Sequence, residues 1–308
     1  MQELIIVSRT SKLAMWQSEY IKARLENKHK IKTSIISLNT KGDLILDKAL
    51  SKIGGKGLFT KELEEKLLNK EAHLAVHSLK DVPAYFENGL MLVATCKREN
   101  PNDSFLSENY ESLEKLPKGA IIGTTSLRRK LQLKLIRPDL VIKDLRGNVN
   151  TRLDKLKKGE YDAIILAMAG IVRLDLFKEV KYIKELSTDI MIPAAGQGIL
   201  GIECKIDEKI SSLLEFLNDE KAMMESTIER DFTRVINAGC GAPIGIHAKV
   251  GDKKIEINAI LGLIDGSKVI KKQILVDINE YKTAGINLAE EFMKLGAKEI
   301  LEENEKLI

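Results

Sequence analysis

Cysteine is scarce in this chain of 308 residues, which contains only Cys96, Cys204 and Cys240. The number is odd, the spacing is wide, and no Cys-x-x-Cys pair occurs. A disulfide framework or a zinc site needs paired or closely spaced cysteines, so the sequence predicts neither. We expect a reducing, cytoplasmic location.

Long apolar runs are missing as well. The longest nearly apolar stretch, Ala163–Val172, is about half as long as a membrane-spanning helix. Glu3 lies where a signal peptide needs positive charge, and the apolar run that follows it is short. We therefore expect neither a membrane segment nor an export signal.

Charge of one sign is not in large excess, since 49 basic residues against 45 acidic ones give a net charge of +4. No stretch places several aromatic residues among Lys and Arg. Nucleic-acid-binding surfaces commonly combine these features, so we expect no nucleic-acid partner. The length is sufficient for two or three compact domains.

The sequence does have a regular alternation of strand-like and helix-like segments, which argues for α/β sheets with helices on both faces. Glu71–Val76 resembles Glu160–Ile165, and each follows a charged helix, which indicates two similarly built halves. We expect strands at 4–8, 31–38, 72–76, 120–123, 140–143 and 162–166, and helices at 11–26, 58–69, 125–136 and 148–157.

Two polar segments that contain proline, Glu99–Asp103 and Pro193–Gln197, separate the halves. Two crossings suggest that the chain leaves the first half, builds the second and returns, so that Ile199–Lys205 becomes a strand of the first sheet. Paired crossings make a hinge with a cleft, a common place for a small ligand. The predicted domains are 1–98 with 199–219, and 103–193.

The pattern changes near residue 221. The segments there predict a small antiparallel α+β domain over 221–308, with Cys240 on the loop that leads into its sheet. The expected elements are a helix at 222–237, strands at 244–250, 255–263 and 269–278, and a final helix with Leu288, Phe292 and Leu295 on one face.

Arginines gather where predicted strands pass into helices. In Gly123–Arg129, Thr124 and Ser126 precede Arg128 and Arg129 at a helix start, where free N–H groups and the helix dipole favour an anion. Arginine adds a fork of donors that suits carboxylates or phosphates. The alternative is a capped helix with a solvated basic face.

Other turns of this kind carry arginine too, and strand ends in open α/β sheets share one edge, where ligands bind. Several separate arginines indicate several anionic groups on the ligand. The residues are Arg9 with Ser11, Arg146-Gly147-Asn148 with Arg152 one helical turn beyond, and Arg173 just after the apolar run.

Asp81 directly follows a predicted strand and lies beside Lys80. A carboxylate there could serve as a general acid or base, or stabilise a cationic intermediate. The alternative is a Lys–Asp turn before Pro83, which the local sequence alone favours. We expect His77 to be structural, and Gly54–Gly57 to form a flap over the cleft, because it lacks the pattern of a phosphate loop.

Cys240 lies between glycines in Gly239–Pro243, which predicts a tight loop with an accessible thiol. Cys96 and Cys204 stand among apolar strand residues, and we expect them to fill the core. A hydrolytic pair of Cys240 with His247 is conceivable, but no Asn or Asp is evident as a third member.

Together these motifs resemble those of the hydroxymethylbilane synthase family, also called porphobilinogen deaminases, over essentially the whole chain. A chance match to seven motifs in the same order is not credible. The motifs are Ser8–Ala14, Gly54–Phe59, His77–Pro83, Gly123–Arg129, Leu145–Thr151 with Arg152, Pro193–Gly198 and Gly239-Cys240.

The resemblance implies an enzyme of tetrapyrrole (haem) biosynthesis that joins porphobilinogen units head to tail into hydroxymethylbilane and releases ammonia. It implies a dipyrromethane primer, built from the same substrate, on a thioether to Cys240. Asp81 would then assist the departure of ammonia and stabilise an azafulvenium cation. Primer-binding residues would be Lys80, Asp81, Thr124, Ser126, Arg128, Arg129, Arg146 and Gly147, and substrate-binding residues Arg9, Ser11, Gln17, Arg152 and Arg173.

The fold implied by the resemblance has three domains, of which the first two are similar to periplasmic solute-binding proteins. We expect a monomer whose partner is the small molecule porphobilinogen. A solute-binding or effector-sensing module for a small polycarboxylate, without catalysis, is the alternative. It would explain the arginines and the hinge, but not Cys240 on a third domain.

Overall fold

The computed structural model describes residues 3–44, 57–237 and 242–307. The first sheet consists of β1 (Glu3–Arg9), β2 (Lys32–Leu38), β3 (Leu74–Ser78), β4 (Leu90–Thr95) and β10 (Leu200–Lys205), in the order β2-β1-β3-β10-β4. β1 is parallel to β2 and β3, whereas β10 is antiparallel to both β3 and β4. The strand predicted at 199–205 is therefore an interior strand of the first sheet.

Helices cover both faces of this sheet because its central strands are apolar on both faces. In β1, Leu4 and Ile6 belong to one buried cluster, and Val7 belongs to another. The first long helix begins at Ser11, whose side chain accepts a hydrogen bond from the Ala14 N–H. The helices are α1 (Lys12–His29), α2 (Lys41–Leu44), α4 (Lys61–Leu68) and α8 (Glu208–Leu214).

The second sheet repeats this plan. It consists of β5 (Asp103–Ser107), β6 (Ile121–Gly123), β7 (Val141–Lys143), β8 (Ala163–Ala167) and β9 (Tyr182–Leu186), in the order β7-β6-β8-β5-β9. Its helices are α5 (Leu127–Ile136), α6 (Val149–Lys157) and α7 (Met168–Arg173). The resembling segments of the sequence fall on β3 and β8, which hold the same place in the two sheets, and β10 and β5 hold the next place.

The third sheet is antiparallel, as predicted, with β11 (Ile244–Val250), β12 (Lys254–Gly262) and β13 (Val269–Asp277) in that order. Its helices are α9 (Glu220–Ile236), α10 (Tyr281–Lys294) and α11 (Ala297–Leu307). Phe232 and Phe292 meet edge to face at 5.0 Å between ring centroids. A Cβ at Gly285 would lie 2.1 Å from the Ile228 carbonyl oxygen, so α10 packs directly on the backbone of α9.

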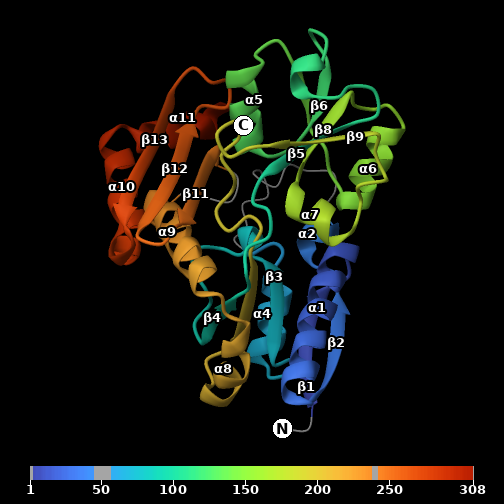
Figure 1. The fold of residues 1–308 in the computed structure, drawn as a ribbon, viewed down its shortest axis with the longest axis vertical. Coiled ribbons are helices and arrows are strands. Elements are labelled where there is room, and N and C mark those ends of the chain that lie inside the picture. The colour runs from blue at the N-terminus through green and yellow to red at the C-terminus, as the bar shows by residue number, and fades with distance from the viewer. Residues whose placement is uncertain (1–2, 45–56, 238–241, 308) are drawn as a thin grey trace.

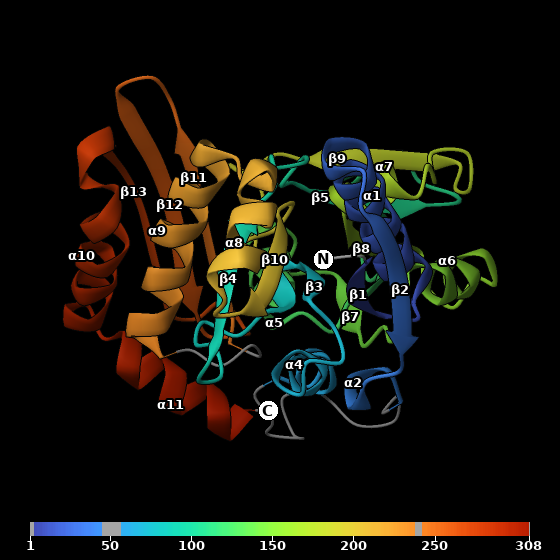
Figure 2. The same cartoon turned by 90° about the horizontal axis from the view of Figure 1, so that it is seen from below.

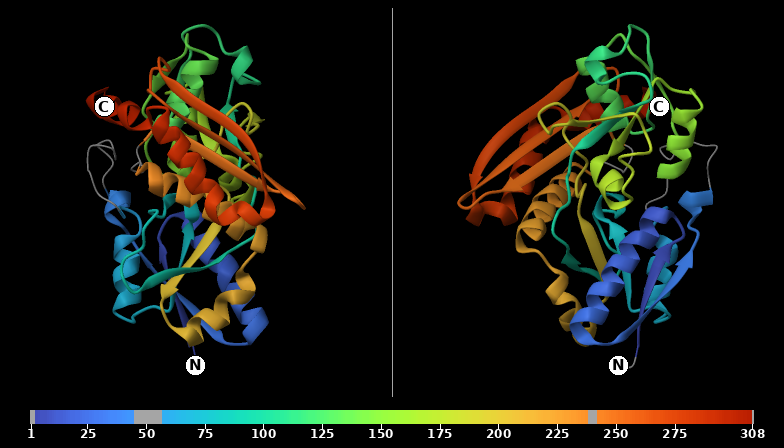
Figure 3. Two further views of the ribbon diagram at one scale, coloured as in Figure 1. Left: turned by 90° about the vertical axis from the view of Figure 1, so that its left-hand side faces the viewer. Right: turned by 45° about the vertical axis from the view of Figure 1, so that its right-hand side comes forward.

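The first and second sheets lie one below the other along the long axis, with the third sheet beside them (Figures 1 and 3). Figure 2 shows α9 and α10 with the third sheet, on one side of the other two units. Ile260 of β12 packs against Leu131 and Ile192, and Arg230 of α9 donates hydrogen bonds to the carbonyls of Val82 and Pro83. The third unit therefore contacts both of the others.

Some elements were not predicted, and one expectation was wrong. Leu295 is 51% exposed just beyond α10, because the chain turns there into a further helix, α11. No sequence pattern predicted β4, β5, β9, α7 or α8. These segments are short, and their mixed or continuously apolar sequences do not distinguish helix from strand over so few residues. No helix among the described residues is long and apolar enough to span a membrane.

Candidate active site

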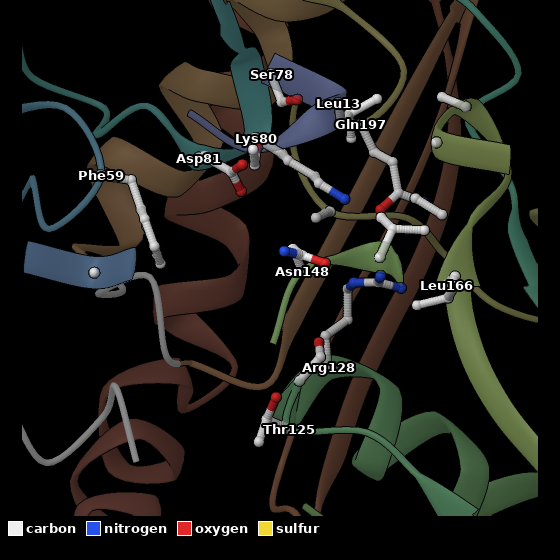
Figure 4. Close-up of a pocket in the computed structure, with 18 of the residues that line it drawn as sticks. Leu13, Phe59, Ser78, Lys80, Asp81, Thr125, Arg128, Asn148, Leu166 and Gln197 are labelled. Carbon is white, nitrogen blue, oxygen red and sulfur yellow. The ribbon is translucent and has the colours of Figure 1, made fainter. Parts of the chain in front are cut away.

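A cavity of about 1350 Å³ lies between the two larger units and is also lined by residues of the third. Ligand pockets are commonly about 300–1,000 Å³, so this cavity has room for a ligand of several rings. Figure 4 shows Lys80 and Asp81 on one side of it and Arg128 and Asn148 on the other.

The cavity is strongly cationic. Its described lining contains ten basic residues and only three acidic ones, so an anionic ligand is favoured there. The acidic residues are Asp43, Asp81 and Asp144, and the basic ones are Arg9, Lys12, Lys80, Arg128, Arg129, Lys130, Arg146, Arg152, Arg173 and Arg230.

Lys80 and Asp81 reach the cavity because a short 3-10 turn, Leu79–Asp81, follows β3 directly. Leu79 is buried and anchors this turn, while the side chain of Asp81 is exposed to the cavity. Burial lowers the pKa of Lys80 to about 8; Asp81 opposes this shift, and Arg129 adds to it. An ammonium group held in this way gains from an added carboxylate.

Arg128 and Arg129, in the first turn of α5, are buried against the carboxylate of Asp103. Arg128 Nη1 lies 2.7 Å from Asp103 Oδ2, and Arg129 donates from Nη2 and Nε to Oδ1 at 2.7 and 3.1 Å. Arg128 also donates to the Ile192 carbonyl, and Arg129 donates to the Ile165 carbonyl. The Nε of Arg128 is buried and has no partner among the described residues.

The hydroxyl groups before α5 divide into two sets. Thr125 and Ser126 line the cavity, and the Ser126 hydroxyl makes no capping hydrogen bond, so it remains a potential donor to a ligand. Thr124 is buried outside the cavity lining, where its hydroxyl accepts from the Ser126 N–H. Thr124 thus supports the turn, whereas Thr125, which was not singled out from the sequence, is at the cavity.

Gly147 has φ of +112°, and a Cβ there would lie 2.7 Å from the side chain of Thr151, so this turn requires glycine. Asn148 caps α6 by accepting from the Thr151 N–H at 3.0 Å. This turn brings Arg146 and Arg152 to the cavity. Arg152 Nε donates to the Gly147 carbonyl at 2.8 Å, and burial, with the nearby charge of Arg129, lowers the pKa of Arg152 to about 10.

Arg9 and Ser11 line the cavity at its other side. Arg9 forms an ion pair with Asp43 and lies over the ring of Phe59, with its Cζ 4.4 Å from the ring centroid. Burial alone would raise the pKa of Asp43, but the hydrogen bond and charge of Arg9 outweigh it and lower that pKa. Gln17 lines a small adjoining pocket and donates to Ser78 Oγ at 2.8 Å.

Two further residues of the cavity lining, Gln197 and Arg230, had no role assigned from the sequence. Asp103, which is buried against the two arginines of α5 rather than in the lining, was missed as well. Gln197 donates to Asp103 at 3.1 Å, and Arg173 Nη2 donates to the Gly198 carbonyl next to it at 2.7 Å. Burial lowers the pKa of Arg230 to about 10, and its partners are backbone carbonyls. Their partners are distant in sequence, so no local motif marks them.

Cys96 and Cys204 are buried in the core of the first unit, as predicted, and burial raises the pKa of each thiol to about 11. His77 is buried as well, and its Nε2 lies 2.8 Å from Glu203, which fits the structural role that we expected. Burial lowers the pKa of His247 to about 3, so this ring is neutral at physiological pH.

Cys240 and the glycines at 54, 55 and 239 lie outside the described residues. The described chain on both sides of Cys240 nevertheless reaches the cavity, since Arg230 and Thr233 of α9 line it before the gap, and Ala242 and Ile244 line it after the gap. Asp43 and Phe59, which lie on either side of the predicted flap in the sequence, line the cavity too.

Residues 4–212 match the family described as "Porphobilinogen deaminase, dipyromethane cofactor binding domain", and residues 223–294 match "Porphobilinogen deaminase, C-terminal domain". The chain belongs to the porphobilinogen deaminase family. Members of this family similar to the chain include the porphobilinogen deaminase of Campylobacter lari, 57% identical over 99% of this chain and 100% of that protein. The enzyme of Aliarcobacter butzleri is 56% identical over 100% and 99%.

Among solved structures, the methionine-binding protein MetQ is similar at a TM-score of 0.45, with 10% identity over 72% of this chain and 92% of that one.

Proposed function

We propose that this chain is a transferase that condenses four porphobilinogen molecules head to tail into hydroxymethylbilane, with release of ammonia, on a dipyrromethane primer joined through a thioether to Cys240. Membership of the porphobilinogen deaminase family supports this function. The structural observation that carries it is the cationic cavity that contains Asp81 and into which the chain leads on both sides of Cys240.

The residues at the cavity fit a dipyrromethane. Two porphobilinogen units bring two acetate and two propionate groups, and the surplus of basic residues in the lining can balance these four carboxylates. The Nε of Arg128 has no hydrogen-bond partner among the described residues, and burial disfavours the charge on the Lys80 amine. Both groups would therefore be stabilised by a ligand carboxylate. We propose that Lys80, Ser126, Arg128, Arg129, Arg146 and Gly147 hold the primer, with Thr124 acting through the turn. When bound, the primer supplies the free pyrrole carbon to which the first new unit is joined, and each added pyrrole supplies that carbon for the next unit.

Asp81 is the residue that we propose to manage protons and charge. It can accept hydrogen bonds from pyrrole N–H groups, and its negative charge stabilises the cation that forms when the aminomethyl group of porphobilinogen leaves as ammonia. After the new carbon–carbon bond forms, the displaced proton of the attacked pyrrole carbon has Asp81 as a nearby acceptor. A single carboxylate among many cations serves these steps without cancelling the attraction for substrate.

Incoming substrate meets a second group of residues in this proposal: Arg9, Ser11, Gln17, Arg152 and Arg173. Arg9 already pairs with Asp43, so a substrate carboxylate would compete with that pair. Arg152 has no carboxylate within ion-pair distance among the described residues, and it is the better anchor of the two. Arg173 joins the substrate region to the second crossing through the Gly198 carbonyl.

We further propose domains of 1–98 with 199–219, 103–193, and 221–308, in a monomer that works in the cytoplasm. The hydrogen bond from the Glu99 N–H to the Gly198 carbonyl, 3.1 Å long, supports the division because it joins the two crossings side by side. Opening or closing at this point would change access to the cavity.

Intact-mass spectrometry of the purified protein tests the proposed function. We expect an added mass equal to two linked pyrrole units, which peptide mapping assigns to Cys240, and we expect Cys240→Ala to lose both the adduct and turnover. Cys96→Ala and Cys204→Ala are matched controls that should keep both, because these thiols are buried in the core. A protein that binds porphobilinogen reversibly without any adduct would support the solute-binding alternative instead.

A further inference from the structure

Asp103 is the first residue of β5, an interior strand of the second sheet, and it is fully buried. Its two carboxylate oxygens accept from both Arg128 and Arg129. The same carboxylate accepts from Gln197 Nε2 at 3.1 Å, and Gln197 Nε2 also donates to the Pro101 carbonyl at 2.7 Å. Asp103 therefore connects α5 with both crossings between the larger units.

Each of the two arginines uses only some of its N–H groups to bind Asp103, so the other N–H groups can bind other partners. Arg129 meets Asp103 through both Nε and Nη2, which fixes the plane of its guanidinium group. Arg128 uses Nη1 for Asp103 and for the Ile192 carbonyl, while its Nε is buried and has no partner among the described residues. Both side chains line the cavity. Asp103 thus decides which donors are available to a ligand.

Charge explains why this carboxylate is needed. Arg128 and Arg129 are adjacent cations in a buried region, and Lys80 lies near enough for both to disfavour its charge. Burial by itself raises the pKa of Asp103, but the two arginines outweigh burial and hold that pKa well below its usual range. The carboxylate stays ionised at all physiological pH values. Without it, the two guanidinium groups would repel each other at close range.

We propose that Asp103 is a positioning residue, which orients Arg128 and Arg129 to receive the carboxylates of the bound pyrrole chain and links that orientation to the crossings through Gln197. This inference rests on the proposed function for its ligand. It adds a residue that touches neither primer nor substrate and that acts through the arginines.

The test compares Asp103→Asn with Glu225→Gln as a matched control. Glu225 is also a buried carboxylate with an arginine partner, since Arg98 Nη1 lies 3.3 Å from it, but it does not line the cavity. The full chains are produced in cells that lack porphobilinogen. Two measurements follow: the rate at which each protein gains the two-pyrrole mass after porphobilinogen is added, and the reaction of single arginines with phenylglyoxal before it is added, mapped by peptide mass.

We expect Asp103→Asn to gain the adduct at least about tenfold more slowly, because at least one charge-assisted contact to a ligand carboxylate is misdirected. Arg128 and Arg129 should become more reactive in this variant, and Arg98 should not. Glu225→Gln should leave the reactivity of Arg128 and Arg129 unchanged and should load at the wild-type rate. A merely structural role for Asp103 would lower the melting temperature without this selectivity.

Folded Asp103→Asn protein that loads at the wild-type rate would overturn the inference. If that variant does not fold, Asp103→Glu decides, because it keeps the charge and moves the carboxylate by one methylene group. Slow loading of the folded glutamate variant supports positioning, and wild-type loading overturns it. Failure of the wild-type chain to gain any adduct would instead refute the proposed function, while unchanged arginine reactivity in the Asp103 variant would refute the proposed orientation separately.

Discussion

Three acidic side chains line the described part of the cavity, and they differ in what surrounds them. Asp43 pairs with Arg9, and Asp144 pairs with Lys130 at 2.7 Å. Asp81 has no ion pair within 4.0 Å among the described residues. A carboxylate that is not already neutralised by a cation is the one that can respond to a positive charge developing on a ligand.

The Asp81→Asn variant should therefore elongate the pyrrole chain roughly 10²–10⁴ times more slowly, equal to about 3–5 kcal/mol of barrier. Asparagine keeps the shape but neither the charge nor the proton chemistry. Single-turnover mixing with porphobilinogen, on protein whose adduct has been verified by mass, isolates this step. Asp144→Asn is the control and should elongate normally. Near-wild-type elongation by loaded Asp81→Asn would exclude Asp81 from the mechanism.

Lys80 gives a dependence of stability on pH. Its pKa in the folded protein, about 8, lies below its ordinary value of 10.5, so between these values the unfolded chain binds more protons than the folded one. The free energy of unfolding of protein without primer should then receive a contribution from Lys80 that rises with pH across this window. Below pH 8 Lys80 is charged in both the folded and the unfolded chain, and the cost of burying that charge lowers the free energy of unfolding by its full amount.

Urea unfolding of the primer-free chain at pH 7.5 to 10.5, compared with Lys80→Met, measures that contribution as the difference between the two proteins. We expect the free energy of unfolding of the wild type, relative to that of Lys80→Met, to increase with pH. This increase should be smaller in protein that carries the primer, because primer carboxylates raise the pKa of Lys80. Parallel curves for the two primer-free proteins would show that folding does not lower the pKa of Lys80.

At the scale of elements, α9 contacts segments that are far from it in the sequence. Glu229 accepts from Arg98 Nη1 at 2.7 Å and from the N–H groups of Gly196 and Ala248. The next residue, Arg230, donates to the carbonyls just after Asp81. The helix that precedes Cys240 in the chain is thus fixed both to the second crossing, at Gly196, and to the turn that carries the proposed catalytic carboxylate.

Replacing Arg230 by Gln should lower the free energy of unfolding by about 2–5 kcal/mol, since two hydrogen bonds from a partly buried cation are lost. Elongation should fall as well, because the Asp81 turn loses its support. Arg234→Gln is the matched control one turn later, where the partly exposed pair with Asp231 contributes about 0–1 kcal/mol. Urea unfolding and single-turnover rates distinguish them; equal losses in the two variants would contradict this role for α9.

Elements with strong periodicity were predictable, and short or mixed ones were not. α1 and the three strands of the third sheet were located within a few residues, because their apolar pattern persists over seven residues or more. The edge strand β9 has polar residues at several positions and gives no such signal. The residues of the site also differ in how predictable they were. Arg128 and Arg146 lie in local sequence motifs, whereas Asp103 and Arg230 bind partners that are close only in the folded protein.

At the scale of the whole molecule, the two crossings lie against each other. Gly198 has φ of +91°, and a Cβ there would lie 2.4 Å from the Glu99 carbonyl oxygen. Gly198→Ala should therefore lower the free energy of unfolding by more than about 3 kcal/mol, through backbone strain and displacement of the other crossing at Glu99.

Gly159→Ala provides the control, because Gly159 has φ of +74° but no atom within 4 Å of the added Cβ. Strain alone should cost about 1–2 kcal/mol there. Equilibrium unfolding in urea gives both values, and similar losses in the two variants would mean that the crossings can separate without penalty.

The placement of β10 has a consequence for the order in which the protein forms during its synthesis. β10 separates β3 from β4, and among the described residues β4 pairs with no other strand. The first sheet therefore cannot close until residue 205 has left the ribosome, and β4 must wait without a partner for more than a hundred residues. The second sheet takes all of its strands from residues 103–186. Although domains generally fold in the order of their synthesis, here the half that is begun first is completed last.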